Sequence, residues 1–159
     1  MEKRVLFVCH GNICRSVMAE MVLKHLVGAE CKDHVQGVST EWMIDSCATS
    51  TEEIGNDIYP PAKRCLAVHG VPYTRHAARQ MTRADFNRFD HIYCMDQNNL
   101  RNIRRMFGDE LADRVRLLMS LVGESRDVAD PWYTGDFEAT YRDVLNGCEK
   151  ILESHRMVS

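Results

Sequence analysis

Segments typical of β-strands alternate along this chain with segments typical of helices. Short apolar runs predict strands over 4–8, 41–46, 91–95 and 115–118. Helical spacing of apolar residues, with proline and glycine at the boundaries of the second segment, predicts helices over 16–26, 60–70, 100–107 and 137–152. Alternating strands and helices are joined by crossover connections, so the strands form a parallel sheet. The chain is therefore predicted to have an α/β fold.

The composition fits one compact domain. The chain has 159 residues, of which 45% are hydrophobic, so it can bury a core but is too short for two ordinary domains. We expect residues 1–159 to form a single domain. No apolar stretch approaches the roughly 18 residues of a membrane span, and no secretion signal is visible, so we expect a cytoplasmic protein with no membrane partner. A net charge of −3 argues against a nucleic-acid partner.

Seven cysteines are scattered along the chain. They are Cys9, Cys14, Cys31, Cys47, Cys65, Cys94 and Cys148. Because the number is odd and no export signal is present, a disulfide framework is not expected. No Cys-x-x-Cys pair occurs, and the histidines are not spaced with the cysteines as a set of zinc ligands. We therefore expect no metal and no cofactor, and most of the thiols are predicted to be small buried hydrophobes.

The loop after the first predicted strand carries the sharpest chemical signal. It reads Cys-His-Gly-Asn-Ile-Cys-Arg-Ser over 9–16 and ends where a helix begins. Backbone N–H groups of such a loop can point inward, the helix N-terminus adds positive potential, and the planar fork of Arg15 matches two phosphate oxygens. These surroundings favour the thiolate form of Cys9. A thiolate beneath a bound phosphate is a nucleophile, so the loop predicts covalent chemistry on a tetrahedral oxyanion.

This loop and the Met-Ala-Glu that follows at 18–20 resemble the signature of the low-molecular-weight protein tyrosine phosphatases, of the bacterial type. The resemblance continues in the family's order through Ile44-Asp45-Ser46-Cys47-Ala48-Thr49-Ser50, His69-Gly70, His76-Ala77-Ala78-Arg79-Gln80, Asp85-Phe86, Phe89-Asp90, Met95-Asp96, Asn99-Leu100 and Asp130-Pro131-Trp132-Tyr133. It implies a four-stranded parallel sheet with helices on both faces and a phosphatase that needs no metal. The implied partner is a phosphotyrosine-containing protein, and the expected state is a monomer or a weak homodimer.

The resemblance assigns the reaction to three residues. Cys9 is the expected nucleophile, Arg15 holds the phosphate, and Asp130 protonates the leaving oxygen. Attack by the thiolate leaves a cysteinyl-phosphate, and Asp130 then accepts a proton from the water that hydrolyses this intermediate. Trp132 and Tyr133 follow the acid directly, and their rings are expected to stack on the phenyl ring of the substrate. Without this context, an Asp-Pro pair is more often only the start of a turn.

The resemblance also implies a wider set of binding and supporting residues. Those expected to line the substrate site, beside the two aromatic residues, are His10, Gly11, Asn12, Ile13, Cys14, Ser16 and Glu52. Those expected to support the loop are Ser46, His69 and Asp96. Asn12, Ser46 and His69 would hold the loop, Ser16 would donate its hydroxyl to the thiolate, and Asp96 would orient the arginine. Without the resemblance, Asn12 is more simply a turn residue, Ser46 a strand end and His69 a cation at a helix C-terminus, and Asp96 has the alternative of a helix cap.

Three positions depart from the family pattern. Val17 stands where most members have proline, which removes a pre-set helical φ near the start of the helix. Glu52 replaces an aromatic residue of many members, so that side of the cleft is predicted to be open and acidic and to disfavour acidic peptides. His10 follows Cys9 where apolar residues are common. Cys14 lies in the same loop, and the sequence leaves open a reversible disulfide between Cys9 and Cys14.

Three functions remain open. Hydrolysis of phosphotyrosine is favoured by Ile13, which offers an apolar wall where a relative specialised for phosphoarginine carries threonine. Arsenate reduction on the same fold needs two further cysteines close together after the third helix, where only Cys94 occurs. A module that binds phosphorylated partners without turnover needs neither a thiolate nor an acid. The combination of Cys9, Arg15 and Asp130 therefore favours the phosphatase.

Overall fold

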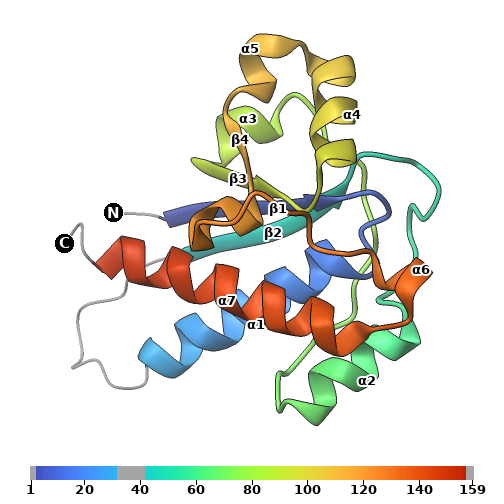
Figure 1. Cartoon of the computed structure of the whole chain (residues 1–159), viewed down its shortest axis with the longest axis vertical. Coiled ribbons are helices and arrows are strands. Elements are labelled where there is room, and N and C mark those ends of the chain that lie inside the picture. Colours follow the sequence, from blue (N-terminus) through green and yellow to red (C-terminus); the bar gives the residue numbers. More distant parts are fainter. Residues whose placement is uncertain (1–2, 32–41, 157–159) are drawn as a thin grey trace.

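A four-stranded parallel sheet forms the centre of the molecule (Figure 1). The computed structural model describes residues 3–31 and 42–156. The strands are β1 (Lys3–Cys9), β2 (Trp42–Ala48), β3 (His91–Cys94) and β4 (Val115–Leu117), in the order β2-β1-β3-β4 with every neighbouring pair parallel. The predicted sheet is confirmed, and the strand ends differ from the prediction by at most two residues. Glu41, the predicted start of the second strand, lies outside the described residues.

The strand order creates a crevice between β1 and β3. The chain passes from β1 to β2 on one side and then crosses to β3 on the other side of β1. Connections that leave neighbouring strands in opposite directions open a crevice at the carboxyl ends of those strands, where ligands of open α/β sheets bind. Cys9 is the last residue of β1, and Asp96 follows β3 by two residues. The topology therefore brings the loop 9–16 and Asp96 to the same end of the sheet.

Helices cover both faces of the sheet, as predicted (Figure 1). One face carries α1 (Arg15–Cys31), α2 (Pro60–Val68) and α7 (Phe137–Arg156), and the other carries α3 (Asp85–Arg88), α4 (Gln97–Phe107) and α5 (Asp109–Ala112). The first helix begins at Arg15 although Val17 replaces the family's proline. None of the helices in the described segments is long and apolar enough to cross a membrane.

The core is divided by the alternation of side chains along β1. Val5 and Phe7 pack in the cluster shared with α1 and α7, whereas Leu6 and Val8 pack in the cluster shared with α4. All four side chains are fully buried. Successive residues of a strand point to opposite faces of the sheet, so a strand buried on both sides is a continuous apolar run. This packing fixes the end of β1, and therefore the position of Cys9.

Four short helical segments escape prediction from periodicity. They are α3, α5, the 3-10 helix η1 (Leu118–Val122) and α6 (Pro131–Thr134). Each has four or five residues, which is too short to show a helical repeat. The last of them is explained by its ends instead, because the carboxylate of Asp130 accepts from Trp132 N and proline occupies the first helical position.

Gly147 lets α7 approach η1 closely, which gives a test of the packing. A Cβ at this position would lie 2.6 Å from Cδ1 and Cγ of Leu118, a fully buried side chain. We expect Gly147→Ala to lower the free energy of unfolding by about 1–3 kcal/mol in urea denaturation, because the buried leucine must move. Gly28→Ala is the matched control, since nothing lies within 4 Å of the added Cβ in α1. It should raise stability by about 0.5–1 kcal/mol, and equal effects of the two changes would contradict the close approach.

Candidate active site

Asn12 shapes the loop between β1 and α1. Its φ is 61°, the one positive value among the non-glycine residues that the structure describes, and its side chain is fully buried. Its amide nitrogen Nδ2 donates to Ser16 Oγ at 2.8 Å and to Ser46 Oγ at 2.9 Å, and its Oδ1 accepts from Arg79 N at 3.2 Å. Asparagine tolerates this left-handed conformation better than most residues. The loop is thus tied to its own helix, to β2 and to the segment that follows α2.

Two residues of the quoted motifs support the loop although the sequence analysis assigned them no role. His76 Nε2 lies 2.7 Å from the carbonyl oxygen of Asn12. Glu20 accepts a hydrogen bond from Ser46 Oγ, and its other carboxylate oxygen accepts from Lys24. Both belong to runs that carry the resemblance, 76–80 and 18–20, and this is the signal that could have identified them.

His69 does not contact the loop that it was expected to hold. Its Nε2 lies 2.7 Å from Glu138 Oε2, and its ring stacks on Tyr141 with 3.8 Å between centroids. The reason is its position at the C-terminal end of α2, which packs against α7. Ser46 does join the loop through Asn12. In the described contacts, the histidine that reaches the loop is His76.

Two hydrogen-bonding groups lie next to the sulfur atom of Cys9. Its Sγ lies 3.0 Å from Ser16 Oγ, and Asn12 N donates to it at 3.3 Å. Ser16 Oγ already accepts from the amide of Asn12, so its own hydroxyl hydrogen is available for the sulfur. Donors that converge on a sulfur atom stabilise its negative charge. The geometry therefore suits a thiolate at the end of β1.

Cys14, the second cysteine of the loop, has different surroundings. Burial raises its pKa, and the negative charges of Cys9 and Asp130 raise it further, to about 12. Cys14 therefore stays a neutral thiol near pH 7, and its pKa lies well above the value of about 8.5 for an ordinary cysteine. Both loop cysteines are free thiols in the structure. The two are chemically distinct, and only Cys9 has the donors that favour a nucleophile.

Arg15 is a buried cation with several partners. Its side chain is 3% exposed. One terminal nitrogen, Nη1, donates to Asp96 Oδ2 at 2.7 Å and to the carbonyl oxygen of Val128 at 2.9 Å, and Nη2 donates to Asp130 Oδ2 at 3.4 Å. Burial lowers the pKa of the guanidinium, but the negative charges of Cys9, Asp96 and Asp130 outweigh this and raise it above its ordinary value. A permanent positive charge thus lies beside the thiol.

Both carboxylates that hold Arg15 also begin a helix. Asp96 uses its second oxygen, Oδ1, to accept from Asn99 N at 2.7 Å at the start of α4. Asp130 uses its Oδ1 to accept from Trp132 N at 3.0 Å at the start of α6. Asp96 is therefore a partner of the arginine and a helix cap at the same time, so its two interpretations do not exclude each other.

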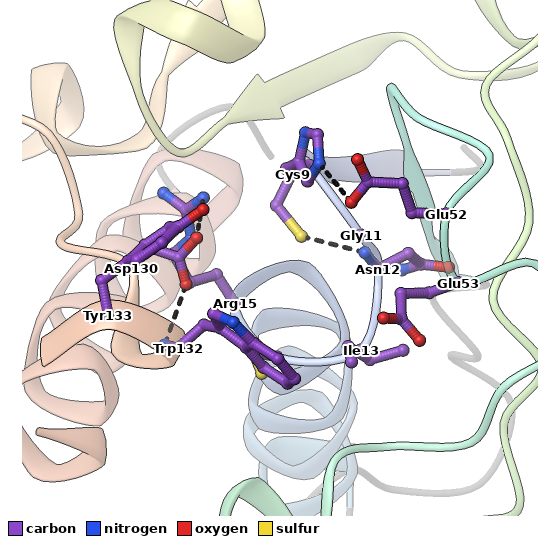
Figure 2. A pocket seen from close by; sticks show the side chains of 12 residues that line it. Cys9, Gly11, Asn12, Ile13, Arg15, Glu52, Glu53, Asp130, Trp132 and Tyr133 are labelled. Atoms are coloured by element: carbon purple, nitrogen blue, oxygen red, sulfur yellow. Dashed lines mark hydrogen bonds and ion pairs between the residues drawn. The ribbon is translucent and has the colours of Figure 1, made fainter. Parts of the chain in front are cut away.

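Cys9, Arg15 and Asp130 line one pocket of about 130 Å³. Its lining residues are Cys9, His10, Gly11, Asn12, Ile13, Cys14, Arg15, Glu52, Glu53, Asp130, Trp132 and Tyr133. Figure 2 shows Trp132 and Tyr133 on the side of α6, and Glu52 and Glu53 on the opposite side. The two aromatic side chains are 55% and 84% exposed, so their rings are available to a ligand. Glu53 belongs to this wall although the sequence analysis did not single it out.

Glu52 and Glu53 form an acidic wall of the pocket. A contact between two side chains at the pocket mouth holds Glu52 in place. His10 Nε2 lies 2.9 Å from Glu52 Oε2. The backbone of the same loop is fixed independently, because Ser50 donates to the carbonyl oxygen of His10 from its N–H and from its hydroxyl. The prediction of an acidic, open side therefore corresponds to the observed position of Glu52.

A family model described as low molecular weight phosphotyrosine protein phosphatase matches residues 4–157. The chain belongs to this family. A rat member is 42% identical over 156 residues, covering 95% of this chain and 94% of the rat protein. The crystal structure of the Bacillus subtilis member YfkJ superposes with a TM-score of 0.89 at 32% identity, covering 100% of this chain and 98% of that one. A Drosophila arginine phosphatase superposes with a TM-score of 0.81 at 32% identity, covering 96% of this chain and 97% of that one.

The strained position of Asn12 gives a second test. We expect Asn12→Ala to lower the free energy of unfolding by about 1–3 kcal/mol, because the change leaves buried partners without hydrogen bonds. Asn12→Gly loses the same bonds but adopts the positive φ without strain, so it should be less destabilised than the alanine variant by about 1 kcal/mol. Urea denaturation of the two variants separates the two contributions. An alanine variant as stable as the glycine variant would contradict the role of the positive φ.

Proposed function

We propose that this chain is a protein tyrosine phosphatase that hydrolyses phosphotyrosine through a cysteinyl-phosphate intermediate. One observation carries the proposal: a single pocket contains the Cys9 thiol, the Arg15 guanidinium and the Asp130 carboxyl group. A nucleophile, a fixed positive charge and an acid are the three groups that phosphoryl transfer to a thiol requires. Membership of the phosphatase family supports the same assignment.

In the first step the phosphate of the substrate binds in the loop 9–16. Arg15 and the inward backbone N–H groups hold its oxygens, and the Cys9 thiolate lies beneath the phosphorus atom. A sulfur–phosphorus bond forms while the bond from phosphorus to the phenolic oxygen breaks. Asp130, in its protonated form, gives its proton to that oxygen, so the substrate leaves as a neutral phenol.

In the second step water attacks the phosphorus atom of the intermediate. Asp130, now a carboxylate, accepts a proton from this water, and the sulfur–phosphorus bond breaks. The electron pair of this bond stays on Cys9 Sγ as the negative charge of the thiolate, and the hydroxyl of Ser16 lies 3.0 Å from the sulfur. Phosphate then leaves. Asp130 keeps the proton that it accepted from the water, so the enzyme again has a Cys9 thiolate and a protonated Asp130, as at the start of the reaction.

The walls of the pocket favour an aryl phosphate. Ile13, Trp132 and Tyr133 present apolar surface around the mouth of the phosphate site, and aromatic rings pack well against the ring of a tyrosine. The Drosophila relative is named an arginine phosphatase, so the fold accommodates substrates other than aryl phosphates. The apolar contribution of Ile13 supports tyrosine as the substrate here.

Arsenate reduction has less support. Such a reaction passes electrons through further reactive cysteines, and Cys94 is the one candidate that the sequence offers. This residue is fully buried, and burial together with the negative charge of Asp96 raises its pKa to about 12. A buried neutral thiol is a poor nucleophile in disulfide exchange.

We further propose that residues 1–159 act as one domain. The support is that one sheet organises both described segments. The expected state, a monomer or a weak homodimer, stays a prediction from the sequence. The cytoplasmic location and the absence of a nucleic-acid partner stay predictions from the sequence.

Release of p-nitrophenol from p-nitrophenyl phosphate, with EDTA and a reductant present, tests the reaction. We expect Cys9→Ser to abolish turnover. Asp130→Asn should lower kcat by about 100- to 10,000-fold, because asparagine still caps α6 but cannot transfer the proton. Circular dichroism of both variants checks that they fold. Absence of turnover by the folded parent protein, or full activity of Cys9→Ser, would refute the proposed mechanism.

The acidic wall predicts a preference among phosphotyrosine peptides. Peptides with lysine or arginine next to the phosphotyrosine should have a higher kcat/KM than peptides with glutamate there. The measured quantity is the ratio of kcat/KM for the basic peptides to kcat/KM for the acidic peptides. Glu52→Gln should reduce this ratio by about two- to fivefold, the size expected for an exposed charge pair. Glu124→Gln, outside the pocket lining, is the control and should leave the ratio unchanged. An unchanged ratio in Glu52→Gln would exclude this residue from peptide selection.

A further inference from the structure

A cluster of metal-ligating side chains lies between α2 and α7. Cys65 and His69 belong to α2 or its C-terminal end, and Glu138 lies in the first turn of α7. Their potential ligand atoms all lie within 4.8 Å of one another. In the described segments, no other group of three or more such residues meets at this distance. None of the three lines the pocket of the proposed phosphatase.

The helices bring these side chains together. Cys65 and His69 are four residues apart, so they lie on the same side of α2, one turn from each other. Glu138 reaches both of them, because its Oε2 lies 2.7 Å from His69 Nε2 and its Oε1 accepts from Cys65 Sγ at 3.6 Å. Spacing alone does not predict such a site, since the carboxylate comes from a segment about 70 residues further along the chain.

The cluster is both anchored and accessible. The ring of His69 is held by its stacking on Tyr141, at an interplanar angle of 13°. Cys65 is buried, whereas the side chains of His69 and Glu138 are 31% and 54% exposed. An ion can therefore enter from the side of Glu138 without opening the core. Ligands fixed by neighbouring contacts need little rearrangement on binding.

We propose that Cys65, His69 and Glu138 form a binding site for a divalent ion of the zinc class, with water as the fourth ligand. A sulfur, an imidazole nitrogen and a carboxylate oxygen are the donors that zinc accepts, at about 2.0–2.3 Å from each. On binding, the thiol of Cys65 releases its proton to solvent and a metal–sulfur bond forms. Soft thiolate and imidazole ligands disfavour magnesium and calcium.

An ion at this site would join α2 to the start of α7, close to the segment that carries Asp130. Phe137, next to Glu138, stacks on Tyr59, and Tyr59 meets the edge of Trp132 with 4.8 Å between ring centroids. The site is therefore a structural clamp and takes no part in the phosphate chemistry. It stands or falls independently of the phosphatase function.

Cobalt is the probe, because a cobalt–thiolate bond gives a charge-transfer band in the near ultraviolet. The titration uses the full chain with Cys9→Ser, so that the thiolate of the pocket does not contribute. We expect one equivalent of Co²⁺ to bind with this band, zinc to displace it, and Mg²⁺ to have no effect. Cys65→Ser should abolish the band, and Glu138→Gln should weaken binding at least tenfold.

Glu153→Gln is the matched control. It removes a carboxylate of similar exposure from the same helix, at 56% against 54% for Glu138, and should bind cobalt like the parent. Zinc should also raise the melting temperature of the parent and not that of Glu138→Gln. Because Glu138 is at the surface, this second readout does not depend on the folding of Cys65→Ser. A parent without the band, or a band that Cys65→Ser and Glu138→Gln leave unchanged, would overturn the proposal.

Discussion

The buried charge of Arg15 is the constraint on which the rest of the site depends. An unpaired guanidinium is costly in a protein interior, so its partners must be in place whenever the chain is folded. Asp96, the carbonyl group of Val128 and Asp130 supply them from the segment after β3 and from the segment before α7. One side chain at the start of α1 therefore fixes the positions of two distant segments relative to the loop 9–16, and the segment before α7 contributes Asp130, Trp132 and Tyr133 to the pocket.

Asn12 complements this arrangement from the other side of the loop. Its left-handed backbone turns the chain so that its own N–H reaches Cys9 Sγ, and its side chain connects Ser16 to Ser46. The same hydroxyl of Ser16 then faces the sulfur. Backbone conformation and side-chain bonding thus act together, which explains why a buried polar network occurs at the end of an otherwise apolar strand.

The sequence predicts what is local and periodic. The strands, the long helices and the loop 9–16 are contiguous patterns, so their positions follow from the order of residues. Contacts between distant segments do not. His69 and His76 are both histidines within motif runs, and only the packing of α2 on α7 decides that the first meets Glu138 and the second meets the loop. One-turn helices such as α6 are likewise fixed by caps and neighbours rather than by periodicity.

The two carboxylates on Arg15 differ in a way that matches the different tasks proposed for them. Asp96 is 14% exposed and contacts the guanidinium at 2.7 Å, so it acts as the lasting counter-ion. Asp130 is 26% exposed and contacts it at 3.4 Å. In the proposed reaction, one carboxyl group must reach both the leaving oxygen of the substrate and the attacking water. The longer and more exposed contact with Arg15 leaves the Asp130 carboxyl group accessible to both, while Asp96 keeps the arginine in place.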